Sequence, residues 1–220
     1  MGATDGNPTA KQERSKETRR KLVASCLELV DRRPFDQVTV VEIAKGAGVS
    51  VGNFYRRFTS KEAILPDLYA AYEDRFATFA GSFSQGEQPE PDDIRGHWDA
   101  LIGRTAAFME SNRGLIQALH LHGRLHPEIV PPASHDRRRS LFTRVGELFS
   151  SEDEARAQTM GQVAILVLVS TLTEQIIYPD HTPAVASGLS TPELADELSR
   201  MLAAYAATSG RRVPSPRYPS

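Results

Sequence analysis

Residues Val38 to Glu62 have the sequence VTVVEIAKGAGVSVGNFYRRFTSKE, which is the pattern of two short helices joined by a tight turn. Thr39 and Glu42 have the spacing of a capping box, in which each side chain bonds a free backbone N–H of the other residue. This signal predicts a helix that begins at about Val40.

A turn and a second helix follow in the same stretch. Gly46 and Gly48 disfavour continuation of the first helix and give the backbone the freedom that a turn needs. Ser50 is a good N-cap, and Phe54 and Phe58 lie at i and i+4, on a face that can pack inward. The opposite face would carry polar and basic side chains, namely Asn53, Tyr55, Arg56 and Arg57. This combination predicts a helix-turn-helix that presents its second helix to DNA.

The same residues carry a resemblance to a known family. The matching positions are Thr39, Val40, Ile43, Ala44, Ala47, Gly48, Val49, Ser50, Gly52, Phe54, Tyr55, Phe58, Ser60, Lys61 and Glu62. At these positions the chain resembles the DNA-binding domain of the TetR family of transcriptional regulators. The resemblance covers the N-terminal third of the chain in one ungapped run, and the remainder is similar only in length and helical character. Pro34 departs from the family, many of whose members have Gly there, but Phe35 can still fill the small core.

The charges are distributed unevenly along the chain. The formal net charge is only -2, yet residues 11–61 carry 12 Lys and Arg against 6 Asp and Glu, and residues 62–220 carry 14 against 21. A basic N-terminal segment on an acidic remainder suits a protein that meets phosphate at one end. A merely solvated charged face is the alternative.

Composition predicts a cytoplasmic protein with no membrane partner and no cofactor. Apolar residues make up 40% and charged residues 25%, as in ordinary soluble proteins. The first ten residues lack the apolar core of a secretory signal, and the longest apolar run, Val163 to Val169, is too short to span a bilayer. Cys26 is the only cysteine, so neither an intramolecular disulfide nor a cysteine-based metal site is expected.

Periodic apolar positions throughout the chain predict an all-α fold. We expect flexible tails at 1–12 and 209–220, a three-helix DNA-binding domain at 13–60 and, by the resemblance, a helical ligand-binding and dimerisation domain at 61–208. Pro66 lies inside the helix expected from Thr59 or Ser60 to about Ser82, where it would either kink that helix as a hinge or mark a break between two helices. A linker is expected at 84–93, and further helices at 94–109, 111–125, 141–149, 153–178 and 191–208.

The candidate DNA contacts lie in and around the helix-turn-helix. Asn53 and Arg56 have the chemistry for bidentate contacts with bases, whereas Thr39, Tyr55 and Lys61 are suited to phosphates. The full set predicted from the resemblance and from helix geometry is Thr39, Ser50, Val51, Gly52, Asn53, Tyr55, Arg56 and Lys61.

The resemblance also implies a ligand pocket and a two-fold interface in the second domain. Aromatic content suggests a pocket lined by Tyr69, Tyr72, Phe76, Trp98, Phe108, His120 and Phe142, although core packing would favour the same residues. The helix at 153–178 is apolar on more than one face, so it needs a second partner besides the core. The expected dimer interface comprises Val163, Leu166, Val169, Leu194, Leu198, Met201, Leu202 and Tyr205, and burial within one subunit is the alternative.

Metal binding and catalysis are not expected. His120, His122 and His126 do not share one helix face, so a solvated or pocket-lining cluster is favoured over a metal site. Ser134, His135 and Asp136 are adjacent in sequence, but a catalytic triad is a spatial arrangement with an oxyanion hole.

The sequence therefore predicts a ligand-responsive DNA-binding regulator. By the resemblance it would be a repressor that binds a near-palindromic operator as a homodimer and is released by a small molecule. The alternatives are a ligand-independent regulator or an activator, and a small-molecule binding protein or enzyme without a DNA function. A DNA binder would lose affinity steeply with rising salt, which separates these classes.

Overall fold

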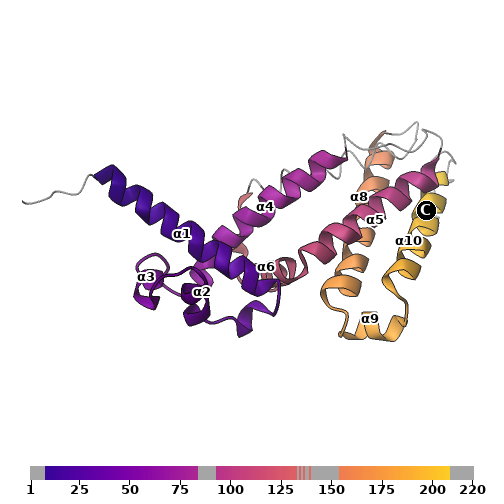
Figure 1. Cartoon of the computed structure of the whole chain (residues 1–220). Coiled ribbons are helices and arrows are strands. Elements are labelled where there is room, and N and C mark those ends of the chain that lie inside the picture. Colours follow the sequence, from indigo (N-terminus) through magenta and orange to yellow (C-terminus); the bar gives the residue numbers. More distant parts are fainter. Residues whose placement is uncertain are drawn as a thin grey trace, which may run out of the picture. The chain divides into compact units, whose positions relative to one another are not determined.

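The computed structural model describes residues 8–83, 93–132, 134, 136, 139 and 154–208, and every regular element within them is a helix (Figure 1). The all-α prediction is confirmed. The elements are α1 (Pro8–Val30), η1 (Phe35–Gln37), α2 (Val40–Gly46), α3 (Val51–Tyr55), η2 (Glu62–Ile64), α4 (Leu65–Ser82), α5 (Ile94–Ser111), α6 (Arg113–Leu125), η3 (Pro127–Ile129), α8 (Glu154–Leu172), η4 (Thr173–Ile177), α9 (Thr182–Ser187) and α10 (Thr191–Ala207). The helix expected at 141–149, the tail at 209–220 and all of the linker expected at 84–93 except Asp93 lie outside the described residues.

The chain forms two compact units. The first comprises residues 1–77 and 112–130, and the second comprises residues 78–111 and 131–220. This division is based on which helices pack together, and it places α6 in the same unit as the helix-turn-helix. The boundary expected near residue 60 separates the DNA-binding domain from the remainder by function instead, and it stays a prediction.

The first unit is built around the inner faces of α1, the helix-turn-helix and α6. Its core contains Leu22, Cys26, Val30, Phe35, Val38, Ile43, Phe54, Phe58, Ile64, Leu65, Leu68, Tyr69, Leu115, Ala118 and Leu119. Cys26 is buried as expected, and burial raises the pKa of its thiol to about 12. The thiol is therefore protonated at neutral pH, and its role is packing.

The start of α1 differs from the prediction. The helix begins at Pro8 rather than near Glu13, so residues 8–12, which were expected in a flexible tail, are helical. Proline is well tolerated in a first helical turn, because its missing N–H would have no intrahelical partner there.

The start of α4 also differs, and it settles the question of Pro66. The 3-10 turn η2 comes first, and α4 begins at Leu65 rather than at Thr59 or Ser60. Pro66 thus lies in the first turn of α4, where it removes no helical hydrogen bond. Ser60 Oγ accepts a hydrogen bond from Ala63 N at 3.3 Å, just before η2 is complete. Pro66 marks a break between two helices, and the kinked-helix alternative was wrong.

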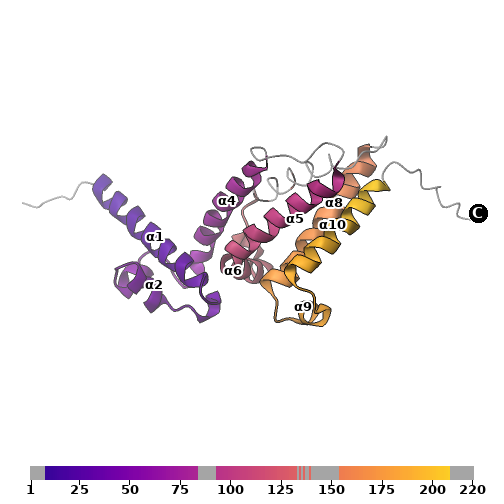
Figure 2. The same ribbon diagram turned by 45° about the vertical axis from the view of Figure 1, so that its right-hand side comes forward.

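In the second unit, α5, α8 and α10 lie side by side (Figure 2). Their buried side chains are Trp98, Leu101, Ile102, Ala106 and Met109 of α5, Met160, Ala164, Ile165, Leu168 and Leu172 of α8, and Leu198, Leu202 and Ala206 of α10. The inward face of α5 follows the helical spacing that the sequence predicts.

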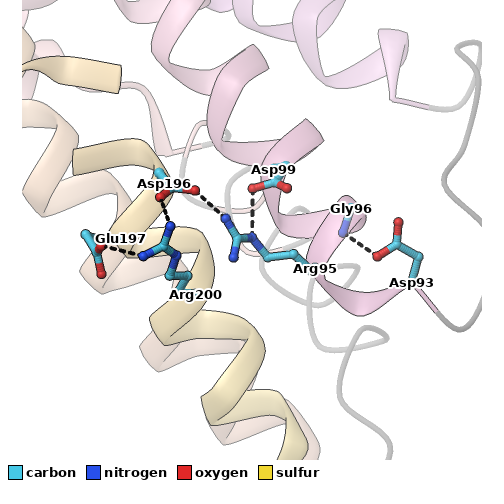
Figure 3. Close-up of polar contacts among 7 residues, drawn as sticks. All are labelled: Asp93, Arg95, Gly96, Asp99, Asp196, Glu197 and Arg200. Carbon is cyan, nitrogen blue, oxygen red and sulfur yellow. Dashed lines mark hydrogen bonds and ion pairs between the residues drawn. The ribbon is translucent and has the colours of Figure 1, made fainter. Parts of the chain in front are cut away.

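A row of charged side chains connects α5 to α10 on the surface of this unit (Figure 3). Arg95 pairs with Asp99 on its own helix, at 3.1 Å, and with Asp196 on α10. Arg200 pairs with Asp196 and Glu197 on α10. Exposed pairs of this kind contribute little stability, because water screens them, so they mainly favour one register between the two helices.

Within the described residues, one continuous helix, Glu154–Ile177, is long and apolar enough to cross a membrane by length and composition. The apolar run Val163 to Val169, which alone is too short to span a bilayer, is only the middle part of this helix. A core helix passes the same test, and 44% of its apolar window is buried inside the protein.

Candidate nucleic-acid interface

The first helix of the helix-turn-helix, α2, begins at Val40, as the sequence predicts. The Thr39 hydroxyl accepts a hydrogen bond from Glu42 N at 3.3 Å, and Thr39 N donates to Glu42 Oε2 at 3.0 Å. This reciprocal pair is the expected capping box, and it begins α2 at Val40.

The two turn glycines have different roles. Gly48 has a φ of 66°, a conformation that side chains other than glycine rarely adopt. Gly46 lies against α1, because a Cβ at this position would be 2.3 Å from Ser25 Oγ. Gly48 thus allows the turn, and Gly46 allows the turn to approach α1. The sequence indicated only that both glycines would allow the turn; it did not indicate the close approach of Gly46 to α1.

The second helix, α3, presents polar groups at its surface. Ser50 Oγ accepts a hydrogen bond from Asn53 N at 3.3 Å and caps the helix. Phe54 is buried, whereas Gly52, Tyr55 and Arg56 are exposed, Tyr55 by 55%. Of the remaining candidates, Thr39 and Ser50 are exposed, and Val51, Asn53 and Lys61 are half-buried. The side chain of Arg56 has no hydrogen-bond or ion-pair partner among the described residues.

Lys61 is engaged within the protein. Its ammonium donates hydrogen bonds to the carbonyl oxygens of Phe35 and Asp36, at 3.0 and 3.2 Å. It also lies 4.6 Å from the centre of the Phe35 ring. The role in phosphate binding that the sequence suggests for Lys61 stays a prediction, and a phosphate would compete with these contacts.

Arg57 ties the short α3 to α1. Its Nη1 donates to Asn53 O at 3.2 Å, and its Nε donates to Ser15 O at 3.3 Å. The sequence places Arg57 on the polar face but indicates no role for it. The spacing between Asn53 and Arg57 could have indicated the first contact, but nothing local indicated the second.

Three other arginines of the basic segment are paired with carboxylates, and one of these pairs, Arg20 with Glu17, lies within α1. Arg19 makes a bidentate contact with Asp67, both distances being 2.7 Å, and this hydrogen-bonded pairing raises the pKa of Arg19. Arg33 pairs with Glu42. That contact, with the hydrogen bonds from Thr39, lowers the pKa of Glu42 from 4.5 to about 2. Part of the positive charge of the segment is therefore used inside the protein.

The predicted ligand residues are divided between the two units. Tyr69 is buried, while Tyr72, Phe76 and His120 are half-buried in the first unit. The ring of Tyr72 contacts those of Tyr69 and Phe76, at centroid distances of 6.0 and 5.9 Å. In the second unit Trp98 is fully buried and Phe108 stacks on Phe79 at 4.5 Å. Phe142 lies outside the described residues, and the pocket stays a prediction.

A groove of about 700 Å³ lies elsewhere, between α1 and α4 of the first unit. None of the described ligand candidates lines it. Its lining comprises Glu13, Lys16, Arg19, Arg20, Val23, Ala24, Leu27, Asp67, Ala70, Ala71 and Asp74. Arg19 and Asp67 join its two walls.

The predicted dimer residues fall into two groups. Val163, Leu166, Val169 and Met201 are exposed, and Leu194 and Tyr205 are half-buried. Leu198 and Leu202 are buried in the core of the second unit, although the sequence placed them at the interface.

His122 and His126 make separate contacts. His122 is buried, and its Nε2 lies 3.2 Å from Asp36 Oδ1. His126 is exposed and pairs with Glu128 at 3.3 Å. Among the described residues, no group of three or more His, Cys, Asp or Glu side chains is arranged to hold a metal ion.

A family model described as bacterial regulatory proteins, tetR family, matches residues 22–68. This range contains the whole helix-turn-helix and the first turn of α4. This segment of the chain is similar to the DNA-binding segment of TetR-family regulators.

Two relatives are described as HTH-type transcriptional regulators. The HTH-type transcriptional regulator EthR of Mycobacterium tuberculosis is 31% identical over 99 residues, which cover 44% of each chain. The uncharacterized HTH-type transcriptional regulator YvdT of Bacillus subtilis is 26% identical over 96 residues, covering 44% of this chain and 47% of YvdT. The match thus spans less than half the length of these relatives. They are described as regulators and not as enzymes, in agreement with the sequence analysis.

Solved structures of TetR-family regulators share the fold. One from Streptomyces coelicolor has a TM-score of 0.58 at 24% identity, with 88% of this chain and 82% of that chain covered. One from Mesorhizobium loti has a TM-score of 0.59 at 14% identity, with 90% and 99% covered. The helical architecture of the TetR family thus extends beyond the segment that the family model matches.

Proposed function

We propose that this TetR-family chain is a transcriptional regulator that binds a near-palindromic DNA operator as a homodimer. The observation that carries the proposal is the surface of α3, a capped helix that buries Phe54 and exposes Gly52, Tyr55 and Arg56. A helix of this kind enters the major groove in helix-turn-helix proteins, with its first residues against base edges.

The chemistry of this surface suits a sequence-specific contact. Asn53 and Arg56 supply bidentate groups for adenine and guanine. The exposed Ser50 and Thr39 stand at the N-termini of α3 and α2, where hydroxyl and backbone N–H donors suit phosphates. The basic charge of residues 11–61 adds attraction to the backbone that does not depend on sequence.

The surface of α8 supports association into a homodimer. Between Ala155 and Ser170, its exposed residues are all uncharged, namely Ala155, Gln158, Thr159, Gln162, Val163, Leu166, Val169 and Ser170. A helix face that met only water would ordinarily carry charges. Two copies related by a two-fold axis would cover this face and would place two recognition helices about 34–36 Å apart, or a multiple of that distance.

The sign of regulation and the ligand response are proposed on the family resemblance. The chain acts as a repressor in the cytoplasm, and a small molecule releases it by favouring a dimer whose recognition helices no longer match the groove spacing. The half-buried aromatic side chains Tyr72 and Phe76 of the first unit support an organic ligand. A ligand-independent regulator or an activator would share the same DNA-binding surface.

Selection from a random duplex library tests the DNA function. We expect a two-fold-related consensus whose affinity falls steeply between low and moderate salt. Asn53→Ala should relax the preference at one position of each half-site, at a cost of about 1–3 kcal/mol in discrimination. Ala107→Ser, on the exposed face of α5, serves as a matched control. If no sequence is enriched, the specific-regulator proposal fails, and a ligand-binding protein without a DNA function becomes the better hypothesis.

A further inference from the structure

Helix α6 lies directly against the helices of the DNA-binding domain. A Cβ at Gly114, in the first turn of α6, would be 1.8 Å from the carbonyl oxygen of Val30 and 2.7 Å from its carbon. The beginning of α6 therefore rests on the backbone at the end of α1. Asn112, which precedes α6, accepts a hydrogen bond from Arg75 of α4 at 2.8 Å.

A second contact is made by His122, near the other end of α6. Its side chain is buried, and its ring meets the Phe35 ring edge-on at a centroid distance of 5.2 Å. Its Nε2 lies 3.2 Å from Asp36 Oδ1. Both partners belong to the short turn η1, which connects α1 to α2.

Lys61 contacts the same turn. Its ammonium donates to the carbonyl oxygens of Phe35 and Asp36 and lies 4.6 Å from the centre of the Phe35 ring. The turn is therefore held by one residue that follows the recognition helix and by one residue of α6.

The position of this turn matters because α2 begins only a few residues after it. Thr39 caps α2 directly after the turn, and α2 packs against α3. The recognition helix has five residues, too few to be stable by itself, so packing must determine where it lies. A displacement of η1 would therefore be passed through α2 to the recognition helix.

We propose that His122 is a positioning residue for DNA recognition, which acts through Phe35 and Asp36 to hold η1, and with it α2 and α3, in the place that operator binding requires. The role rests on the proposed DNA-binding function. His122 does not itself contact DNA.

The exposure of Asp36 distinguishes this role from ordinary core packing. The Asp36 side chain is 62% exposed, so water can replace His122 as its partner at little cost in stability. What is lost without His122 is the restriction on the orientation of the turn. Removal of the His122 nitrogen should therefore change DNA affinity more than it changes the unfolding temperature.

Two substitutions at His122 separate the roles. His122→Leu keeps apolar volume beside Phe35 but removes the nitrogen, whereas His122→Gln keeps an N–H donor near the position of Nε2. On the selected operator, we expect His122→Leu to bind about fivefold more weakly, and His122→Gln to recover most of that loss. His126→Leu, on the exposed residue just beyond α6, is the control and should bind like the wild type.

A double-mutant cycle tests the route of the effect. If His122 acts through Asp36, Asp36→Ala should weaken operator binding. The affinity of the double variant, Asp36→Ala with His122→Leu, should then be no lower than that of the single variant with the lower affinity. Additive losses would overturn the route through Asp36.

The controls separate failure of this inference from failure of the proposed function. If the wild type binds its operator and His122→Leu binds equally well, the positioning role is overturned and the DNA function stands. If His122→Leu and His122→Gln weaken binding equally, with matching losses in unfolding temperature, the residue has only a structural role. A wild-type chain that binds no duplex would overturn both proposals.

Discussion

The carboxylate of Glu42 is held at the start of the helix-turn-helix by contacts from two directions. Arg33 pairs with it from the end of the α1 segment, and Thr39 bonds it through both its hydroxyl and its backbone N–H. These contacts favour the charged form, so the pKa of Glu42 falls from 4.5 to about 2. Because the folded pKa is depressed, Glu42 contributes stability above about pH 4.5 and loses that contribution as the pH falls towards 2.

Glu42→Gln should therefore flatten the dependence of stability on pH between 4.5 and 2. The wild type should lose stability over this range more steeply than the variant, as measured by urea unfolding followed by circular dichroism. Glu110→Gln, at an exposed position on α5, controls for the removal of one negative charge. Parallel curves for wild type and Glu42→Gln would show that the contacts around Glu42 do not persist in solution.

Lys61 has two possible roles in DNA binding, and the salt dependence of binding distinguishes them. Lys61→Met removes the ammonium and keeps much of the apolar stem. If the ammonium contacts a phosphate, the slope of log affinity against log salt should fall by about 1. If Lys61 acts mainly by holding η1, affinity should fall while the slope stays the same. The contacts to Phe35 and Asp36 lead us to expect the second result, and a reduced slope would contradict it.

At the scale of elements, the attachment of α6 to α1 depends on a glycine. The backbone of α6 approaches the end of α1 so closely at Gly114 that a side chain of any size would meet the Val30 carbonyl. A backbone atom cannot move aside as the end of a flexible side chain can, so the two helices would have to separate.

Gly114→Ala should thus destabilise the protein by about 1–3 kcal/mol, as overpacking does elsewhere. Gly103→Ala is the matched control, because Gly103 lies within α5 and a Cβ there would meet nothing within 4 Å. That substitution should leave stability unchanged or raise it by up to about 1 kcal/mol, through the better helix propensity of alanine. Thermal unfolding at equal protein concentration measures both, and equal shifts for the two variants would contradict the close contact.

At the scale of the whole molecule, the uncharged face of α8 is the feature that a single copy leaves unexplained. Leu166 stands near its middle and is 63% exposed. The apolar side chains Met201 and Tyr205 of α10 are also exposed or half-buried. Together these residues form the surface that a two-fold partner would cover.

Leu166→Glu should weaken self-association by more than about a hundredfold, because two-fold symmetry would bury two unpaired carboxylates. Light scattering after gel filtration would then show monomers at concentrations where the wild type is dimeric. Ala107→Glu adds the same charge to the exposed face of α5 and should leave the dimer intact. A Leu166→Glu variant that still forms wild-type dimers would exclude this face as the interface.

Much of the fold could be predicted because the relevant signals are local. The capping box of Thr39 and Glu42, the Ser50 cap and the Phe54–Phe58 face operate over three or four residues, and all are present as expected. The signals for the start of α4 were also local, but they competed with one another. Ser60 caps the chain instead of Thr59, and a 3-10 turn separates it from Pro66. Because both capping residues and the proline lie within eight residues, local preferences alone do not decide between these helix starts.

The amino-acid sequence by itself determined that this chain is all helical, that it contains a helix-turn-helix and that one face of its second helix is polar. These properties follow from periodicity and capping, which depend on near neighbours. Only the tertiary structure decided that Lys61 bonds to the carbonyls of Phe35 and Asp36, that Arg57 bonds to that of Ser15, that Leu198 and Leu202 belong to a core, and that His122 reaches η1. Each of these outcomes depends on which distant segment lies opposite a side chain, and packing of the whole unit determines that.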